Sequence, residues 1–104
     1  RFFDAPVGLF VYIDRNMGPP QWSDVGMFLQ TVMLIAREKG LHSCAQEAWA
    51  MWHSTVNKHL VVDDKFMLFC GMGIGYADEN HPINSWITDR EGVDNFTTFY
   101  GFEK

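Results

Sequence analysis

Residues 22–49 read WSDVGMFLQTVMLIAREKGLHSCAQEAW, and the helix that they predict organises the rest of the chain. Apolar residues recur there every three or four positions, which places them on one side of an α-helix. They are Val25, Phe28, Leu29, Val32, Ile35 and Ala36. Met27, Met33 and Leu34 fall outside that side, so the helix is apolar most of the way round. Such a helix needs cover on several sides, and we expect it to be central in the fold.

Both ends of this helix carry sequence signals. Ser23 is predicted to be the N-cap, with Trp22 and Met27 spaced as a hydrophobic staple. Gly40 is predicted to end the helix in the left-handed conformation, with Leu41 folding back onto the last turn. Residues 41–49 are then expected to form a loop that leads into a second helix and presents backbone groups to a ligand.

The remaining sequence predicts two strands, a second helix and an arm. Residues 7–13, VGLFVYI, are a continuous apolar run and predict a strand buried on both faces. Residues 15–21 predict a loop, and residues 48–59 predict the second helix. The second strand is predicted over residues 65–77, KFMLFCGMGIGYA. From Asp78 onward we expect an extended arm whose aromatic residues need a surface to dock on. These residues are Phe96, Phe99, Tyr100 and Phe102.

The second predicted strand has one bare face. Gly71, Gly73 and Gly75 alternate along it and therefore point to the same side. A strip of sheet without side chains allows another group to approach the backbone closely. We expect the central helix to pack there, with direct ligand contact as the alternative. The G-x-G-x-G spacing, which continues into acidic sequence, differs from a dinucleotide-binding fingerprint.

Length and charge limit the classes of partner. The 104 residues suffice for one domain at most. A formal net charge of −5 without a Lys/Arg cluster provides no footprint for nucleic acid or an anionic membrane surface. No apolar run is long enough to span a bilayer, so a cytoplasmic protein is expected. Two buried strands cannot form a stable sheet by themselves, and the chain begins at Arg1 without an initiator Met. We therefore expect part of a longer chain or an obligate oligomer.

Residue spacing predicts neither a metal site nor a catalytic side chain. The four histidines form no pair at ligand spacing with a cysteine, except for His42 beside Cys44. Cys44 could act as a nucleophile near His42, but a small buried thiol is the expected role. Arg90 could bind a phosphate bidentately, although a single loop arginine is usually solvated.

Three stretches in order resemble the C-terminal half of the FMN-dependent NAD(P)H nitroreductase family. They are FFDAPVGLFVYIDRNMG, residues 22–49, and FMLFCGMGIGYADENHPIN with TDRE after it. The most specific motifs are D-x-G-x-x-x-Q-x-x-x-L-x-A-x-x-x-G-L and G-x-x-x-G-Y-x-D. The resemblance implies an α+β nitroreductase-like fold, with residues 1–104 as the C-terminal part of the domain. It also implies an intertwined homodimer that binds FMN at the subunit interface, with the arm adding a strand to the partner's sheet.

The resemblance also implies the cofactor-binding residues. Ala45, Gln46, Glu47 and Ala48 would lie along the flavin, with the Glu47 backbone N–H near flavin N5. Arg90 aligns with an arginine that binds the FMN phosphate. The family often has proline at position 45 and glycine at position 48, where this chain has alanine. The family's N-terminal half, with its Arg-Arg-Ser phosphate motif, has no counterpart in these 104 residues.

The implied function is that of a flavin oxidoreductase. Hydride would pass from NAD(P)H through flavin N5 to a nitroaromatic or quinone acceptor in a ping-pong sequence, with no catalytic side chain assigned. The alternative is a non-catalytic, truncated nitroreductase-like dimerisation module without bound flavin. An Arg/Ser-rich phosphate motif upstream of Arg1 would favour the enzyme, and a start codon there would favour the module.

Overall fold

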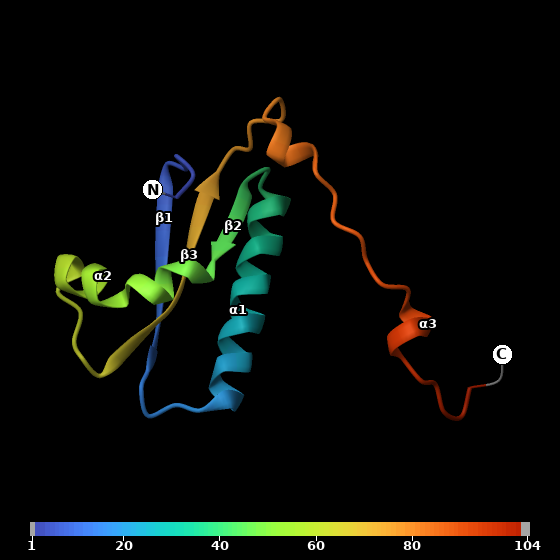
Figure 1. Ribbon diagram of the computed structural model, residues 1–104, viewed down its shortest axis with the longest axis horizontal. Coiled ribbons are helices and arrows are strands. Elements are labelled where there is room, and N and C mark those ends of the chain that lie inside the picture. Colours follow the sequence, from blue (N-terminus) through green and yellow to red (C-terminus); the bar gives the residue numbers. More distant parts are fainter. Residues whose placement is uncertain (1, 103–104) are drawn as a thin grey trace.

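The computed structural model describes residues 2–102, so Arg1 and the last two residues lie outside the described part. Three antiparallel strands form one sheet in the order β1-β3-β2 (Figure 1). The strands are β1 (Val7–Asp14), β2 (His42–Gln46) and β3 (Phe66–Gly75). The helices are α1 (Pro19–Glu38), η1 (Glu47–Trp52), α2 (His53–Leu60), η2 (Pro82–Ser85) and α3 (Val93–Phe96). An α+β arrangement is therefore confirmed.

The helix α1 begins earlier than predicted. Gly18 is the N-cap and the two prolines Pro19 and Pro20 occupy the first helical positions, so the assignment of Ser23 as N-cap was wrong. Proline suits these positions because their N–H groups have no acceptor within the helix. The Gln21 side chain accepts a hydrogen bond from the Gly18 N–H at 3.2 Å. Ser23 lies inside the first turns, where its hydroxyl donates to the Pro19 carbonyl at 3.3 Å.

The C-terminal end of α1 is confirmed. Gly40 has a φ of 76°, in the left-handed region that glycine adopts without strain. Its N–H donates to the Arg37 carbonyl at 3.0 Å, and the Leu41 N–H donates to the Ala36 carbonyl at 2.8 Å. This pair of bonds is a Schellman motif, which satisfies two carbonyls of the last turn.

The segment predicted as a loop after α1 contains a strand. His42 to Gln46 pair with β3, from His42 opposite Gly75 to Gln46 opposite Gly71. The sequence HSCAQ is short and lacks an apolar run, so its strand conformation comes from pairing with β3 and not from local propensity. β3 is consequently the central strand, with β1 on one side and β2 on the other.

The two faces of β3 are covered by different elements. Leu29 of α1 packs with Cys70 and Met72, which form the buried core on one face. The glycine face is instead occupied by the segment after residue 1 and by Trp49 of η1. The expectation that α1 packs on the glycines was therefore wrong. The helix buries more apolar surface against the larger side chains of the opposite face.

The second helix is divided. The 3₁₀-helix η1 precedes the α-helix α2, in place of one continuous helix over residues 48–59. Val56 of α2 is buried, whereas Trp52, the last residue of η1, is exposed. α2 ends at Leu60, and its C-cap residue Val61 has a left-handed φ of 54°.

Beyond residue 77 the chain leaves the sheet as an extended arm that carries η2 and α3 (Figure 1). Its aromatic side chains are exposed. β1 is also less covered than predicted, since it lies at the sheet edge and its first two residues are exposed. Within residues 2–102, no helix has the length and apolar character required to cross a membrane.

Candidate functional site

Four of the five predicted site residues lie together at the end of β2 and the start of η1. Ala45 and Gln46 are the last residues of β2, opposite Met72 and Gly71 of β3, and Glu47 and Ala48 open η1. Ala45, Glu47 and Ala48 are exposed. The two methyl side chains leave the backbone of this segment open to close approach by a planar group.

The first residue of η1 provides a backbone donor. η1 begins at Glu47, and no side chain caps it. The N–H groups of a helix's first turn have no acceptor inside the helix. The Glu47 N–H therefore has no acceptor within η1, and the family resemblance places this N–H at the contact to flavin N5.

Only one of the two polar atoms of the Gln46 side-chain amide has a hydrogen-bond partner among the described residues. Its Oε1 accepts a hydrogen bond from the Trp49 indole Nε1 at 2.8 Å. Its Nε2 is buried and has no hydrogen-bond partner among the described residues. Leaving a buried donor unpaired costs about 1–3 kcal/mol, so this amide has a donor to offer to another group.

A hollow of about 380 Å³ opens beside this segment. Its lining combines the ends of β2 and η1 with the first turns of α2. The lining residues are Gln46, Ala48, Trp49, Trp52, Thr55 and Val56. Most of these side chains are apolar or aromatic, which suits an uncharged planar ligand.

The structure does not bring Arg90 to the other four residues. Its Nη1 donates to the carbonyls of Thr88, at 3.3 Å, and Asp89, at 3.0 Å, and to the Thr88 hydroxyl. All these acceptors lie within two residues of Arg90. The arm between η2 and α3, which carries Arg90, extends away from the sheet (Figure 1). Its contact with a phosphate remains a prediction.

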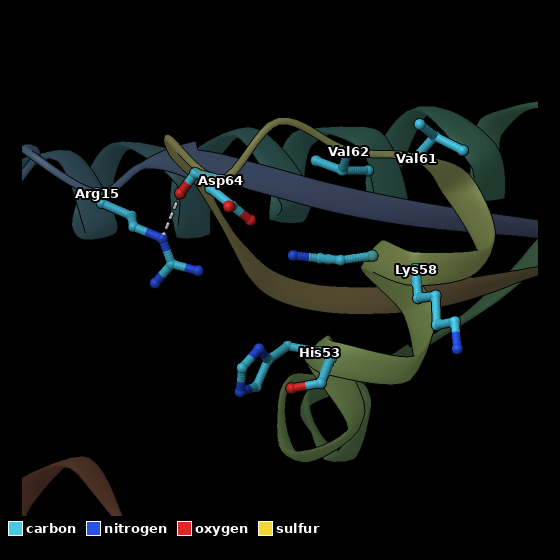
Figure 2. A pocket seen from close by; sticks show the side chains of 8 residues that line it. Arg15, His53, Lys58, Val61, Val62 and Asp64 are labelled. Atoms are coloured by element: carbon cyan, nitrogen blue, oxygen red, sulfur yellow. Dashed lines mark hydrogen bonds between the residues drawn. The ribbon is translucent and has the colours of Figure 1, made fainter.

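A second hollow, of about 480 Å³, was not anticipated from the sequence. It lies between the turn after β1, the helix α2 and the loop before β3, and none of the predicted site residues lines it. Figure 2 shows Arg15 beside Asp64, whose backbone carbonyl accepts a hydrogen bond from Arg15 Nε at 2.7 Å. Lys58 and His53 come from α2. Arg15 and Asp64 are far apart in sequence, so no local motif could have indicated this hollow.

The two cysteines differ in their environment. Cys44 is exposed on β2, so the expectation of a buried thiol was wrong at this position. Cys70 is buried on β3. Burial raises the pKa of the Cys70 thiol, and the nearby charge of Glu47 raises it further. In residues 2–102 no group of three or more His, Cys, Asp or Glu side chains could hold a metal ion.

We expect iodoacetamide to alkylate Cys44 at least about tenfold faster than Cys70 near neutral pH, because alkylation needs an accessible thiolate. The test is time-resolved mass spectrometry of the folded protein, with Cys44→Ser and Cys70→Ala as variants that each retain one thiol. Both thiols should react at similar rates in denaturant. Equal rates in the folded protein would contradict the burial of Cys70.

Comparisons with known proteins agree with this architecture. The model of the nitroreductase family matches residues 1–76. The 4-nitrobenzoate reductase of Pseudomonas putida is 47% identical over 103 residues, which are 99% of this chain and 45% of that protein. The nitrobenzene nitroreductase of Ectopseudomonas oleovorans is 39% identical, over 95% of this chain and 44% of that protein.

Solved structures give the same result. The FMN and NADPH-dependent nitroreductase NfnB from Sphigopyxis sp. strain HMH superposes with a TM-score of 0.94 at 51% identity, over 98% of this chain and 46% of that one. The FMN-dependent nitroreductase NfnB from Mycobacterium smegmatis, solved in complex with NADPH, superposes with a TM-score of 0.91 at 29% identity, over 95% and 44%. The chain spans less than half the length of these relatives. With this family match and these superpositions, the chain belongs to the nitroreductase family and has part of the nitroreductase-like fold.

Proposed function

We propose that the protein containing this chain binds FMN and reduces nitroaromatic or quinone acceptors with NAD(P)H. The observation that carries the proposal is the start of η1 at Glu47, which no side chain caps, flanked by exposed Ala45 and Ala48. One related nitroreductase of known structure is FMN and NADPH-dependent, and another is FMN-dependent and was solved in complex with NADPH, which supports the same cofactor and reductant here.

The residues present fit an isoalloxazine ring. Small side chains at positions 45 and 48 leave the backbone open, and the neighbouring hollow is mostly apolar. Gln46 Nε2 is a buried donor without an acceptor in residues 2–102. A flavin ring combines an apolar face with several hydrogen-bond acceptors, so both features favour it.

Each site residue has a defined role in this proposal. Ala45 and Ala48 allow close approach of the ring, and the Glu47 N–H donates to flavin N5. Gln46 lies beside the ring, and Arg90 binds the phosphate, for which the guanidinium fork is well shaped. When bound, FMN supplies the hydride-transfer chemistry by which NAD(P)H and the acceptor are used in turn, in a ping-pong sequence. The chain supplies placement and a donor, and we assign no acid or base.

A homodimer is part of the proposal. α1 carries a second apolar surface that the described residues leave exposed, including Phe28 and Leu34. The aromatic side chains of the arm are exposed as well. A second copy would cover both surfaces and could bring Arg90 to a flavin held by the other subunit. We also propose that the protein works in the cytoplasm, where NAD(P)H is available.

The test begins with the visible spectrum of the purified protein after FMN is added and the excess removed by dialysis. We expect retained flavin bands that NADPH bleaches and that 4-nitrobenzoate restores. Glu47→Pro should lower the rate of 4-nitrobenzoate reduction by about tenfold or more, because it removes the backbone donor, together with the carboxylate, at a helical position that tolerates proline.

Glu47→Ala is the matched control, since it removes the carboxylate but keeps the N–H. It should retain the bands and most of the activity. A colourless wild-type protein would overturn the flavin proposal. Equal activity of the proline and alanine variants would overturn the role given to the Glu47 N–H.

A further inference from the structure

The indole of Trp49 packs against two aromatic rings on the glycine face of β3. The Phe2 ring stacks on it, with ring centroids 4.8 Å apart and an interplanar angle of 29°. The Phe10 ring meets it edge-on at 5.2 Å and 89°. Phe2 and Phe10 also contact each other at 5.1 Å. We call Phe2, Phe10 and Trp49 the aromatic cluster.

Two glycines make room for the aromatic cluster. A Cβ on Gly71 would lie 2.4 Å from Trp49 Cδ1, and a Cβ on Gly8 would lie 2.3 Å from Phe2 Cε2. Real Cβ atoms essentially never approach another heavy atom so closely. The two rings can therefore pack here only because Gly8 and Gly71 have no side chain. Part of the glycine face of β3, at Gly71, is thus the surface against which the indole packs.

The indole is hydrogen-bonded to the candidate flavin-binding segment, residues 45–48. Trp49 Nε1 donates to Gln46 Oε1 at 2.8 Å, which closes a loop over residues 46–49. The other amide atom, Gln46 Nε2, has no partner within residues 2–102. Gln46 is also paired with Gly71 through the β2–β3 ladder. The backbone between Gln46 and Trp49 is therefore fixed at both ends, by the sheet and by the aromatic cluster.

We propose that Trp49 is a positioning residue that sets the direction of the Glu47 N–H. Its ring, clamped by Phe2 and Phe10 over bare Gly71, fixes η1 against β3, and its Nε1 orients Gln46. This inference rests on the proposed function, because the direction of that N–H matters through the flavin. Trp49 acts through the backbone of residues 46–48 and need not touch the flavin.

Trp49→Phe tests the proposal, because it keeps an aromatic ring packed against Gly71 and removes the hydrogen-bond donor to Gln46. We expect FMN to bind about three- to tenfold more weakly and its midpoint potential to shift, since one net hydrogen bond is lost. In the flavin-free protein, the amide resonances of Glu47 and Ala48 should broaden or double. Trp22→Phe on α1 is the matched control and should change none of these.

A double-mutant cycle with Gln46→Met separates positioning from direct contact. In the Gln46→Met background, Trp49→Phe should add less than about twofold to the loss of FMN affinity. Fully additive effects, or a Trp49→Phe protein with wild-type affinity and potential, would overturn the inference. If the wild-type protein binds no FMN, the proposed function fails. The inference is then decided by the Glu47 and Ala48 resonances alone, and unchanged signals in Trp49→Phe overturn it.

Discussion

Replacing Gly71 by alanine is expected to destabilise the protein by about 1–3 kcal/mol, the usual cost of overpacking a filled interior. The new Cβ would lie 2.4 Å from Trp49 Cδ1 and 3.0 Å from Phe2 Cε1. Both atoms belong to rigid rings in the aromatic cluster, so neither can yield by a small rotamer change. β3 is held by β1 and β2 on its two sides, which prevents the backbone from moving away.

Gly26→Ala is the matched control for this prediction. Gly26 lies inside α1, and nothing lies within 4 Å of the Cβ that alanine would add there. The same substitution should stabilise the protein by about 0.5–1 kcal/mol, because glycine is unfavourable inside a helix. Urea unfolding followed by circular dichroism measures both variants. Similar stabilities of the two variants would contradict the close packing of Trp49 against Gly71.

Gly71→Ala should also reproduce the loss of FMN affinity expected for Trp49→Phe, because both changes disturb the contacts of Trp49 that fix the backbone of residues 46–49. The two variants reach the segment by different routes, one by steric displacement and the other by loss of a donor. Agreement between them would locate the effect in the aromatic cluster and not in the indole alone.

The sequence predicted the elements whose periodicity is strong, and missed those that depend on tertiary pairing. The apolar runs of β1 and β3 and the repeat in α1 were sufficient to place those elements. β2 was missed because HSCAQ becomes a strand only beside β3. The start of α1 was misplaced because Ser23 resembles an N-cap, whereas Pro19 and Pro20 fit the first helical positions better.

The candidate site could be predicted in part. Ala45 to Ala48 were indicated by the family resemblance, and the structure places them together at one end of the sheet. The part played by Trp49 was missed because it depends on Phe2 and Gly71, which are far away in sequence. Only the three-residue spacing of Gln46 and Trp49 at the start of a helix was a local signal. Arg90 lies in the arm, which extends away from the sheet (Figure 1), and the structure does not bring it to the other four residues.

The position of the core has a consequence for how the fold is stabilised. The buried apolar cluster between α1 and β3 consists of few side chains, with Leu29, Cys70 and Met72 at its centre. The opposite side of α1 is apolar but uncovered among the described residues. We therefore expect two separable contributions to stability, one within the chain and one from whatever covers α1.

Leu29→Ala should remove much of the stability that comes from packing within the chain. It should lower the free energy of unfolding by about 2–5 kcal/mol, as large-to-small changes in a core do. Leu29 is 5% exposed and packs directly on Cys70 and Met72, so the cavity would open at the centre of the cluster. Natural domains are stable by about 5–15 kcal/mol, and this loss is a large part of that margin. Urea unfolding at several protein concentrations is the measurement.

Leu34→Ala makes the same change on the same helix at a residue that is 61% exposed within this chain. At concentrations where the protein is monomeric it should cost less than about 0.5 kcal/mol, as surface substitutions usually do. In the proposed homodimer its cost should grow as concentration rises, because stability is then linked to association. The loss in Leu29→Ala should be present at every concentration, since that side chain is buried by its own chain. A loss below about 1 kcal/mol for Leu29→Ala would contradict the core described here, because buried leucines elsewhere cost more.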